Sequence, residues 1–127
     1  MPVTAPKILV VGDTPRWIQG VRKTLPNECE VHTCLDFVAA MQALFMDDMS
    51  FDLCIVANKL IEEDEGLHIL QELRDDGRTN PFIVYSQSVS IVTQSKVTAL
   101  GGIVIIPKDI TQPCLKLKET VTELLVK

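Results

Sequence analysis

Short apolar runs alternate with segments of helical spacing along the chain, and this alternation predicts the order of the elements. Four runs rich in β-branched residues are too short for helices and are typical of parallel strands buried on both faces. They are Lys7–Val11, Leu53–Ala57, Phe82–Tyr85 and Ile103–Ile106. A fifth segment, Glu30–Cys34, alternates polar and apolar residues, which indicates an edge strand with one wetter face.

A stripe of apolar residues at helical spacing follows each strand. Thr14 and Pro15 suit the N-cap and first position of one helix, Asp36 suits the cap of a second, and Gly77 is a suitable stop for a third. A fourth helix, from about 89 to 100, is weaker because its Val, Ile and Thr residues are β-branched. The other four stripes are Ile18, Val21 and Leu25; Phe37, Ala40, Met41 and Leu44; Leu67, Leu70 and Leu73; and Cys114, Leu117, Val121 and Leu124.

This (βα)5 order predicts an α/β fold of three layers, in which helices cover both faces of a doubly wound, five-stranded parallel sheet. We expect one domain over 1–127, with its core at about 7–125. Functional residues of such folds lie at the carboxyl ends of the strands. The candidate positions are Gly12, Asp13, Ala57, Asn58, Ser86, Gln87, Pro107 and Lys108.

The composition narrows the possible partners. A net charge of −5 and scattered basic residues argue against direct nucleic-acid binding. The four cysteines form no CxxC pair and no zinc-ligand spacing, which favours reduced thiols. There is no apolar stretch of signal-peptide or membrane-span length. We therefore expect a cytoplasmic protein that does not bind membranes.

The strand ends resemble those of the receiver domain of two-component response regulators, from about Lys7 to Leu125. The resemblance rests on five segments in order, which are Ile8–Pro15, Asp52–Ala57, Gly66–Arg74, Pro81–Ser86 and Ala99–Lys108. It implies a CheY-like, flavodoxin-like strand order of 2-1-3-4-5. It also implies a pocket where an aspartate accepts a phosphoryl group beside Mg²⁺, a hydroxyl and a lysine.

The pocket departs from the family's pattern at the positions that carry its chemistry. Asp13 matches the second residue of the family's acidic pair, whereas Gly12 replaces the first and Ala57 stands at the acceptor position. Ser86 and Lys108 match the hydroxyl and the lysine. An alanine methyl cannot attack phosphorus, and one carboxylate of three remains for a metal. We therefore expect no catalysis, no cofactor, and weak or absent Mg²⁺ binding.

Other positions bear on how the pocket communicates with the surface. The family's aromatic switch residue is replaced by Ile105. Asp13 and Lys108 either form an ion pair across the emptied pocket or are family remnants. Ser86, Ser88 and Ser90 are either modification sites or, as is common for serines at a strand-to-helix junction, caps and turn formers. The candidate partner face consists of Val89, Ile91, Val92 and Val97, with Met46 and Met49 as a second candidate patch.

These observations predict a phosphorylation-independent pseudo-receiver that acts through protein–protein interaction and is not an enzyme. Its partner would be a kinase, an output domain or a second copy of the chain. One alternative is a small-anion or ligand sensor in which Lys108, Ser86 and strand-end amides bind an anion. Another is a regulatory domain that belongs to a longer response regulator or kinase.

Overall fold

The computed structural model describes residues 5–26, 28–46, 51–60, 64–108 and 114–125. Its five strands are β1 (Lys7–Val11), β2 (Glu30–Cys34), β3 (Leu53–Val56), β4 (Phe82–Tyr85) and β5 (Ile103–Ile105). All neighbouring strands are parallel, in the order β2-β1-β3-β4-β5. The predicted sheet and its strand order are confirmed.

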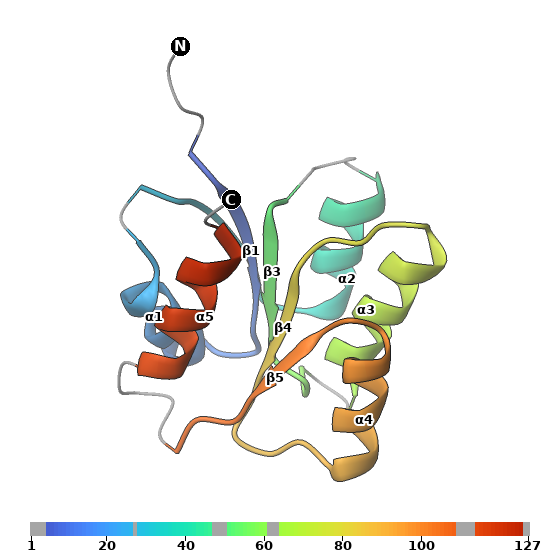
Figure 1. Cartoon of the computed structure of the whole chain (residues 1–127). Helices are drawn as coiled ribbons and strands as arrows, with labels where there is room; N and C mark the ends of the chain where they lie inside the picture. Colours follow the sequence, from blue (N-terminus) through green and yellow to red (C-terminus); the bar gives the residue numbers. More distant parts are fainter. Residues whose placement is uncertain (1–4, 27, 47–50, 61–63, 109–113, 126–127) are drawn as a thin grey trace.

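The helices cover both faces of this sheet. They are α1 (Pro15–Thr24), α2 (Phe37–Met41), which continues as the π-helical turn η1 (Gln42–Met46), α3 (Glu65–Asp75), α4 (Ile91–Ala99) and α5 (Leu115–Leu125). Figure 1 shows α1 and α5 on one face and α2, α3 and α4 on the other. This arrangement is the predicted three-layer α/β fold.

Side-chain caps begin the first two helices where the sequence predicts them. The Thr14 hydroxyl accepts a hydrogen bond from the Trp17 amide at 3.2 Å, with Pro15 at the first helical position. The Asp36 carboxylate accepts from the Ala39 amide at 2.7 Å. Because these caps satisfy amides that have no partner within the helix, they fix where each helix starts after its strand.

The fourth helix begins at Ile91, two residues later than the predicted start. Ser90 occupies its N-cap and accepts from the Thr93 amide at 3.1 Å, so the capping role expected of this serine is confirmed. Gly77, with φ 80°, follows the end of α3 and donates its N–H to the Arg74 carbonyl at 3.0 Å. The predicted stop of α3 is therefore also confirmed.

The core lies along the central strands. Every residue of β3 and β4 is buried, whereas the edge strand β2 exposes Glu30, His32 and Thr33 and buries Cys34. This contrast is the one that the apolar runs and the alternating segment predict. Parallel strands buried on both faces supply a rigid base for the residues at their carboxyl ends.

Several predicted boundaries need correction. β5 ends at Ile105, and Ile106 beyond it is 46% exposed. α1 ends at Thr24, so Leu25 is its extended C-cap residue, although its side chain is still buried. β3 ends at Val56, but Ala57 continues the ladder by donating its N–H to the Val11 carbonyl at 2.9 Å.

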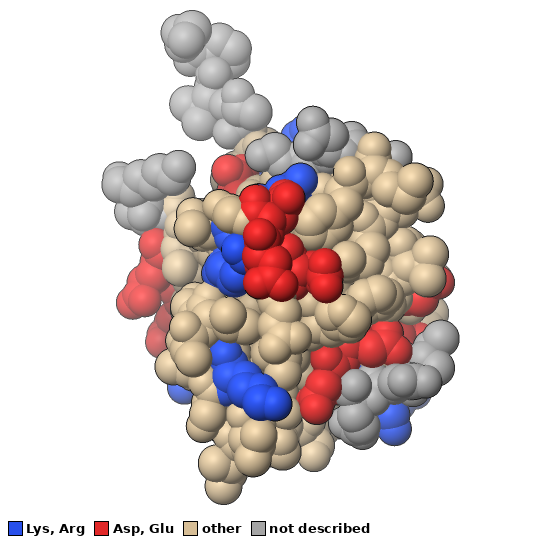
Figure 2. Space-filling model, turned by 90° about the vertical axis from the view of Figure 1, so that its right-hand side faces the viewer, with Lys and Arg blue, Asp and Glu red and all other residues tan. Residues whose placement is uncertain are grey.

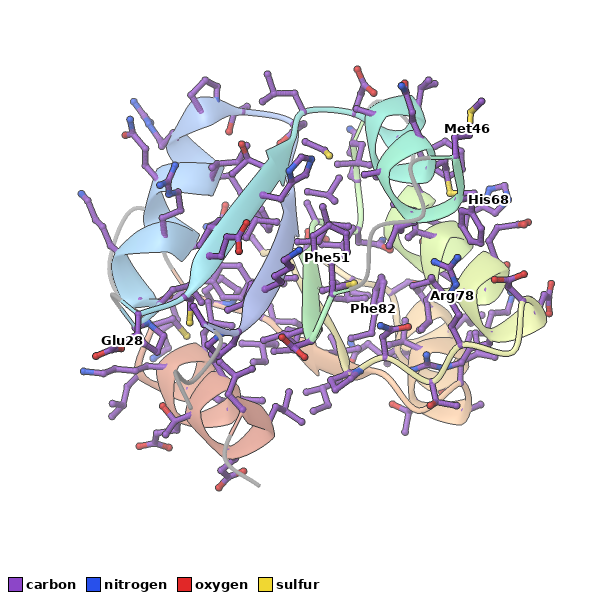
Figure 3. The ribbon with its side chains drawn as sticks, turned by 90° about the horizontal axis from the view of Figure 1, so that it is seen from above. Glu28, Met46, Phe51, His68, Arg78 and Phe82 are labelled. Atoms are coloured by element: carbon purple, nitrogen blue, oxygen red, sulfur yellow. The ribbon has the colours of Figure 1, made fainter. Side chains whose placement is uncertain are left out.

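Two arginines hold the opposite end of the α2, α3 and α4 layer together. Arg74 donates to the carbonyls of Leu100, Arg78 and Asn80 at 2.6, 2.9 and 2.9 Å. Arg78 donates to the Leu44 carbonyl of η1 at 2.6 Å and lies 4.9 Å from the ring centre of Phe45. Figure 3 shows Arg78, Met46 and His68 on the same side of the sheet, opposite Glu28.

No helix in the described ranges is long and apolar enough to cross a membrane.

Candidate functional site

Four residues form one row across the carboxyl ends of β1, β3, β4 and β5. The register of the last paired residues, continued by one position, places Gly12 beside Ala57 and Ala57 beside Tyr85. Tyr85 in turn pairs with Ile105. Because residues in register on parallel strands point to the same face, these four positions face one common space.

Trp17, from the first turn of α1, lies in that space beside Gly12 and Tyr85. Its indole is 4% exposed, and its Nε1–H donates to the carbonyl oxygen of Tyr85 at 3.1 Å. The two rings lie 5.9 Å apart at an angle of 56°, a tilted packing that aromatic pairs favour. The only Trp and the only Tyr of the chain therefore meet at this site.

Gly12 is the residue that makes this placement of the indole sterically allowed. A Cβ at position 12 would lie 2.7 Å from Trp17 Cζ3 and closer still to Cε3, distances that real Cβ atoms do not show. The indole thus occupies the volume into which any side chain at position 12 would point. The expectation of an emptied pocket is wrong at this position, because an aromatic ring fills it.

Sequence reasoning missed Trp17 as a residue of the site. Its two partners are Gly12, at the end of β1, and Tyr85, which lies 68 positions further along the chain. A lone tryptophan in the first turn of a helix, shortly after a glycine at a strand end, is the local signal that could have indicated the contact.

Asp13 and Lys108 lie at the same end of the sheet, and both are exposed. They form no ion pair with each other in the part of the chain that the structure describes. The hypothesis of an ion pair across the pocket is therefore wrong. An exposed Asp and Lys that do not meet keep their hydration instead.

Ser86 and Ile105 lie at adjoining strand ends. The Ser86 amide donates to the Ile105 carbonyl at 3.2 Å, and the Ser86 side chain is half-buried. The Ile105 side chain, at the position of the family's switch aromatic, is 2% exposed. An aliphatic side chain buried in this way has no hydroxyl with which to make an alternative hydrogen bond.

The residues at the site do not fit a magnesium ion. Mg²⁺ prefers octahedral oxygen ligands, including one or two carboxylates. Gly12 and Ala57 provide no side-chain oxygen, and the Asp13 carboxylate is exposed. Over the described ranges, no three His, Cys, Asp or Glu side chains come together as a metal site.

Of the four residues of the candidate partner face, two are buried and two are exposed. Val97 is fully buried and Val89 is 9% exposed, so both belong to the core, and their assignment to the face is corrected. Ile91 and Val92, in the first turn of α4, are 81% and 64% exposed. The side of α3 and α4 in Figure 2 shows broad uncharged areas around clusters of acidic groups.

The second candidate patch is only partly described. Met46, at the end of η1, is 81% exposed, and Met49 lies outside the described residues. Met46 therefore adds an exposed apolar side chain at the end of η1, far along the chain from the first turn of α4.

Comparison with solved structures identifies the fold. The phosphorylated cyanobacterial phytochrome response regulator RcpA superposes with a TM-score of 0.79 at 21% identity, over 95% of this chain and 94% of that chain. The chemotaxis response regulator CheY4 of Vibrio cholerae gives 0.75 at 22% identity, over 96% and 100%. The response regulator TrrA of Thermotoga maritima, in complex with Mg²⁺ and BeF, gives 0.75 at 22% identity, over 94% and 99%.

No protein-family model and no curated protein matches the sequence. The strand order and the layers define a flavodoxin-like α/β fold. Within that class, the superposed structures show that the chain has the CheY-like fold of response-regulator receiver domains.

Proposed function

We propose that this chain is a phosphorylation-independent pseudo-receiver, a signalling module that acts through protein–protein interaction in a two-component or phosphorelay-type system. The observation that carries the proposal is the Trp17 indole, which lies over Gly12 on the row that includes Ala57. In this protein a buried aromatic ring occupies the volume into which a carboxylate side chain at position 12 would extend.

The chemistry of the site supports this function rather than catalysis. Formation of an acyl phosphate requires a carboxylate oxygen as nucleophile, and Ala57 offers a methyl group. The charge on a transferring phosphoryl group would need the metal and its ligands nearby, and Asp13 alone remains. We therefore propose that the chain is not an enzyme and that it binds Mg²⁺ weakly or not at all.

A fixed conformation also follows from the contacts of Trp17. The hydrogen bond from its indole to Tyr85 joins α1 to the end of β4, and the bond is buried. Because a buried N–H and carbonyl are costly to separate without new partners, the bond favours one arrangement of the pocket. A receiver held in this way presents the same surface to its partner at all times.

The surface we propose for the partner is the first turn of α4, where Ile91 and Val92 are exposed. Two exposed apolar side chains side by side suit a protein partner, either a kinase, an output domain or a second copy of the chain. The acidic net charge of −5 makes direct binding of nucleic acid unfavourable. We place the protein in the cytoplasm, where two-component partners are found.

Incubation with acetyl phosphate and Mg²⁺, followed by intact-mass measurement, tests the proposal. The chain should gain no phosphoryl group, and the variant Ala57→Asp should also stay unmodified, because Trp17 and Gly12 still deny the metal its ligands. A triple variant, Gly12→Asp with Trp17→Ala and Ala57→Asp, restores the missing groups and serves as the positive comparison. Stoichiometric, Mg²⁺-dependent modification of the native chain would overturn the proposal.

A further inference from the structure

A chain of side-chain hydrogen bonds joins the end of β3 to the first turn of α4. Asn58, which is 1% exposed, donates its Nδ2 to Oδ1 of Asp64 at 3.0 Å. The same oxygen accepts from the Thr93 hydroxyl at 2.9 Å, and Thr93 Oγ1 accepts from the Ser90 hydroxyl at 2.9 Å. We refer to these four side chains as the Asp64 latch.

Asp64 adopts an unfavourable backbone conformation in order to make these contacts. Its φ of 61° is the only positive value at a non-glycine residue in the described ranges. This left-handed region is disfavoured for L-residues, although Asp tolerates it better than most. Asp64 also stands at the N-cap of α3, yet its carboxylate makes no capping bond there. The contacts with Asn58 and Thr93 therefore outweigh the local preferences of the residue.

The latch also determines how α4 begins. Thr93 is 3% exposed, and its amide donates to Ser90 Oγ at 3.1 Å, so the same hydroxyl pair caps the helix and connects it to Asp64. Ile91 and Val92 lie between these two residues and are exposed. Because Asp64 Oδ1 accepts from both Asn58 and Thr93, the side-chain bonds that join the first turn of α4 to the end of β3 meet at one carboxylate oxygen.

We infer that the Asp64 latch is a positioning device that fixes the apolar surface of α4 relative to the residue next to Ala57. Its hydrogen bonds hold the first turn of α4, with Ile91 and Val92, against the end of β3. Without the Asp64 carboxylate, Asn58 and Thr93 would lose the bonds that join these two segments. The device goes beyond the proposed function, because its contacts lie within the free chain and need no partner.

Amide hydrogen exchange in the free, full-length protein tests the latch. The reporters are the amides of Thr93 and Gln94, which donate to the Ser90 hydroxyl and carbonyl at 3.1 and 2.9 Å. Thr93→Val removes the hydroxyl at nearly constant volume, and Asp64→Gly removes the carboxylate while it relieves the positive φ. Ser95→Ala and Asp75→Asn, exposed positions on α4 and α3, are the matched controls.

The expected result is a local effect. In both latch variants the two reporter amides should exchange about tenfold faster or more, relative to amides of β3, while the controls leave them unchanged. Asp64→Asn keeps an acceptor oxygen and tolerates the left-handed backbone, so its reporter amides should exchange at rates between those of the controls and those of the two latch variants. Equal acceleration of the β3 amides would show a general loss of stability, and unchanged reporters would show no coupling. Either result would overturn the inference, whether or not a partner of α4 is ever found.

Discussion

The indole of Trp17 packs directly against Gly12 at the end of β1, in the space that a side chain at position 12 would occupy. A methyl group at position 12 would lie 2.7 Å from the indole Cζ3, so the two residues are compatible only because one of them has no side chain. The same indole reaches Tyr85, whose carbonyl accepts its N–H. The CheY-like fold is thus retained around an aromatic pair at the end of β1.

Substitution at this pair should show strong coupling. Gly12→Ala should destabilise the protein by about 1–3 kcal/mol through overpacking, and Trp17→Ala by about 3–5 kcal/mol through the cavity it leaves. In the double variant the methyl group no longer meets a ring, so the combined loss should be smaller than the sum by about 1–2 kcal/mol. Urea unfolding followed by circular dichroism measures all three. Strict additivity would show that the two side chains do not compete for space.

Arg74 should be the most sensitive arginine to substitution. Its guanidinium donates to three backbone carbonyls, and partial burial lowers its pKa, mainly through desolvation. Arg74→Ala should lower the free energy of unfolding by about 2–4 kcal/mol because it leaves these carbonyls unpaired. Arg74→Lys should recover less than half of the free energy lost in Arg74→Ala, since an ammonium group cannot reproduce the planar donor geometry of the guanidinium.

Arg22→Ala is the control for this prediction. Arg22 is an exposed residue of α1, and its loss should change stability by less than about 0.5 kcal/mol. If Arg74→Ala were as mild as Arg22→Ala, the three carbonyl contacts would not contribute as the geometry indicates.

Cys54 should make the protein less stable at alkaline pH. Complete burial raises the pKa of its thiol from 9.0 to about 12, mainly through desolvation. Between these two values the native state binds more protons than the unfolded state, so the free energy of unfolding falls as pH rises, by at most about 1.4 kcal/mol per pH unit. Urea unfolding across this pH window gives the free energy of unfolding of the native chain and of Cys54→Ala. The difference between the two values at each pH isolates the contribution of the thiol. Parallel pH profiles of the two proteins would contradict it.

The exposed first turn of α4 should matter for binding and not for folding. Ile91→Asp and Val92→Asp should change stability by less than about 0.5 kcal/mol, because both side chains are exposed. Either change should weaken association with the partner, because it places a charge in an apolar contact. Val97 on the same helix is buried, so Val97→Ala should lower the free energy of unfolding by about 1–3 kcal/mol.

The strands could be predicted because their signal is local. Each buried strand is a short β-branched run that contains its own evidence of burial on both faces, and Glu30–Cys34 contains its own alternation. The caps at Thr14, Asp36 and Ser90 are also local, since each hydroxyl or carboxylate bonds to an amide three residues away. Among the strands, the prediction differs from the structure only at the carboxyl ends of β3 and β5.

The site could be predicted only in part, because its key contacts join distant segments. The positions of Gly12 and Ala57 follow from the strand ends, but the contact of Trp17 with Tyr85 spans 68 positions. The phase of α4 depends on its cap at Ser90, which decides that Val97 points inward and Ile91 outward. Neither a long-range ring contact nor a helix phase can be read from a short, uniformly apolar segment.

The indole N–H resonance of Trp17 reports on whether the ring stays over Gly12, and the chain has one tryptophan and hence one such signal. A titration with Mg²⁺ and beryllofluoride, followed by ¹H–¹⁵N correlation spectra, reports whether the ring leaves its place over Gly12. The resonance should keep its position and stay protected from solvent exchange, as expected for a buried bond to Tyr85. A saturable shift of this signal, with loss of its protection, would show that the pocket opens to the phosphoryl analogue and that the chain is not a phosphorylation-independent pseudo-receiver.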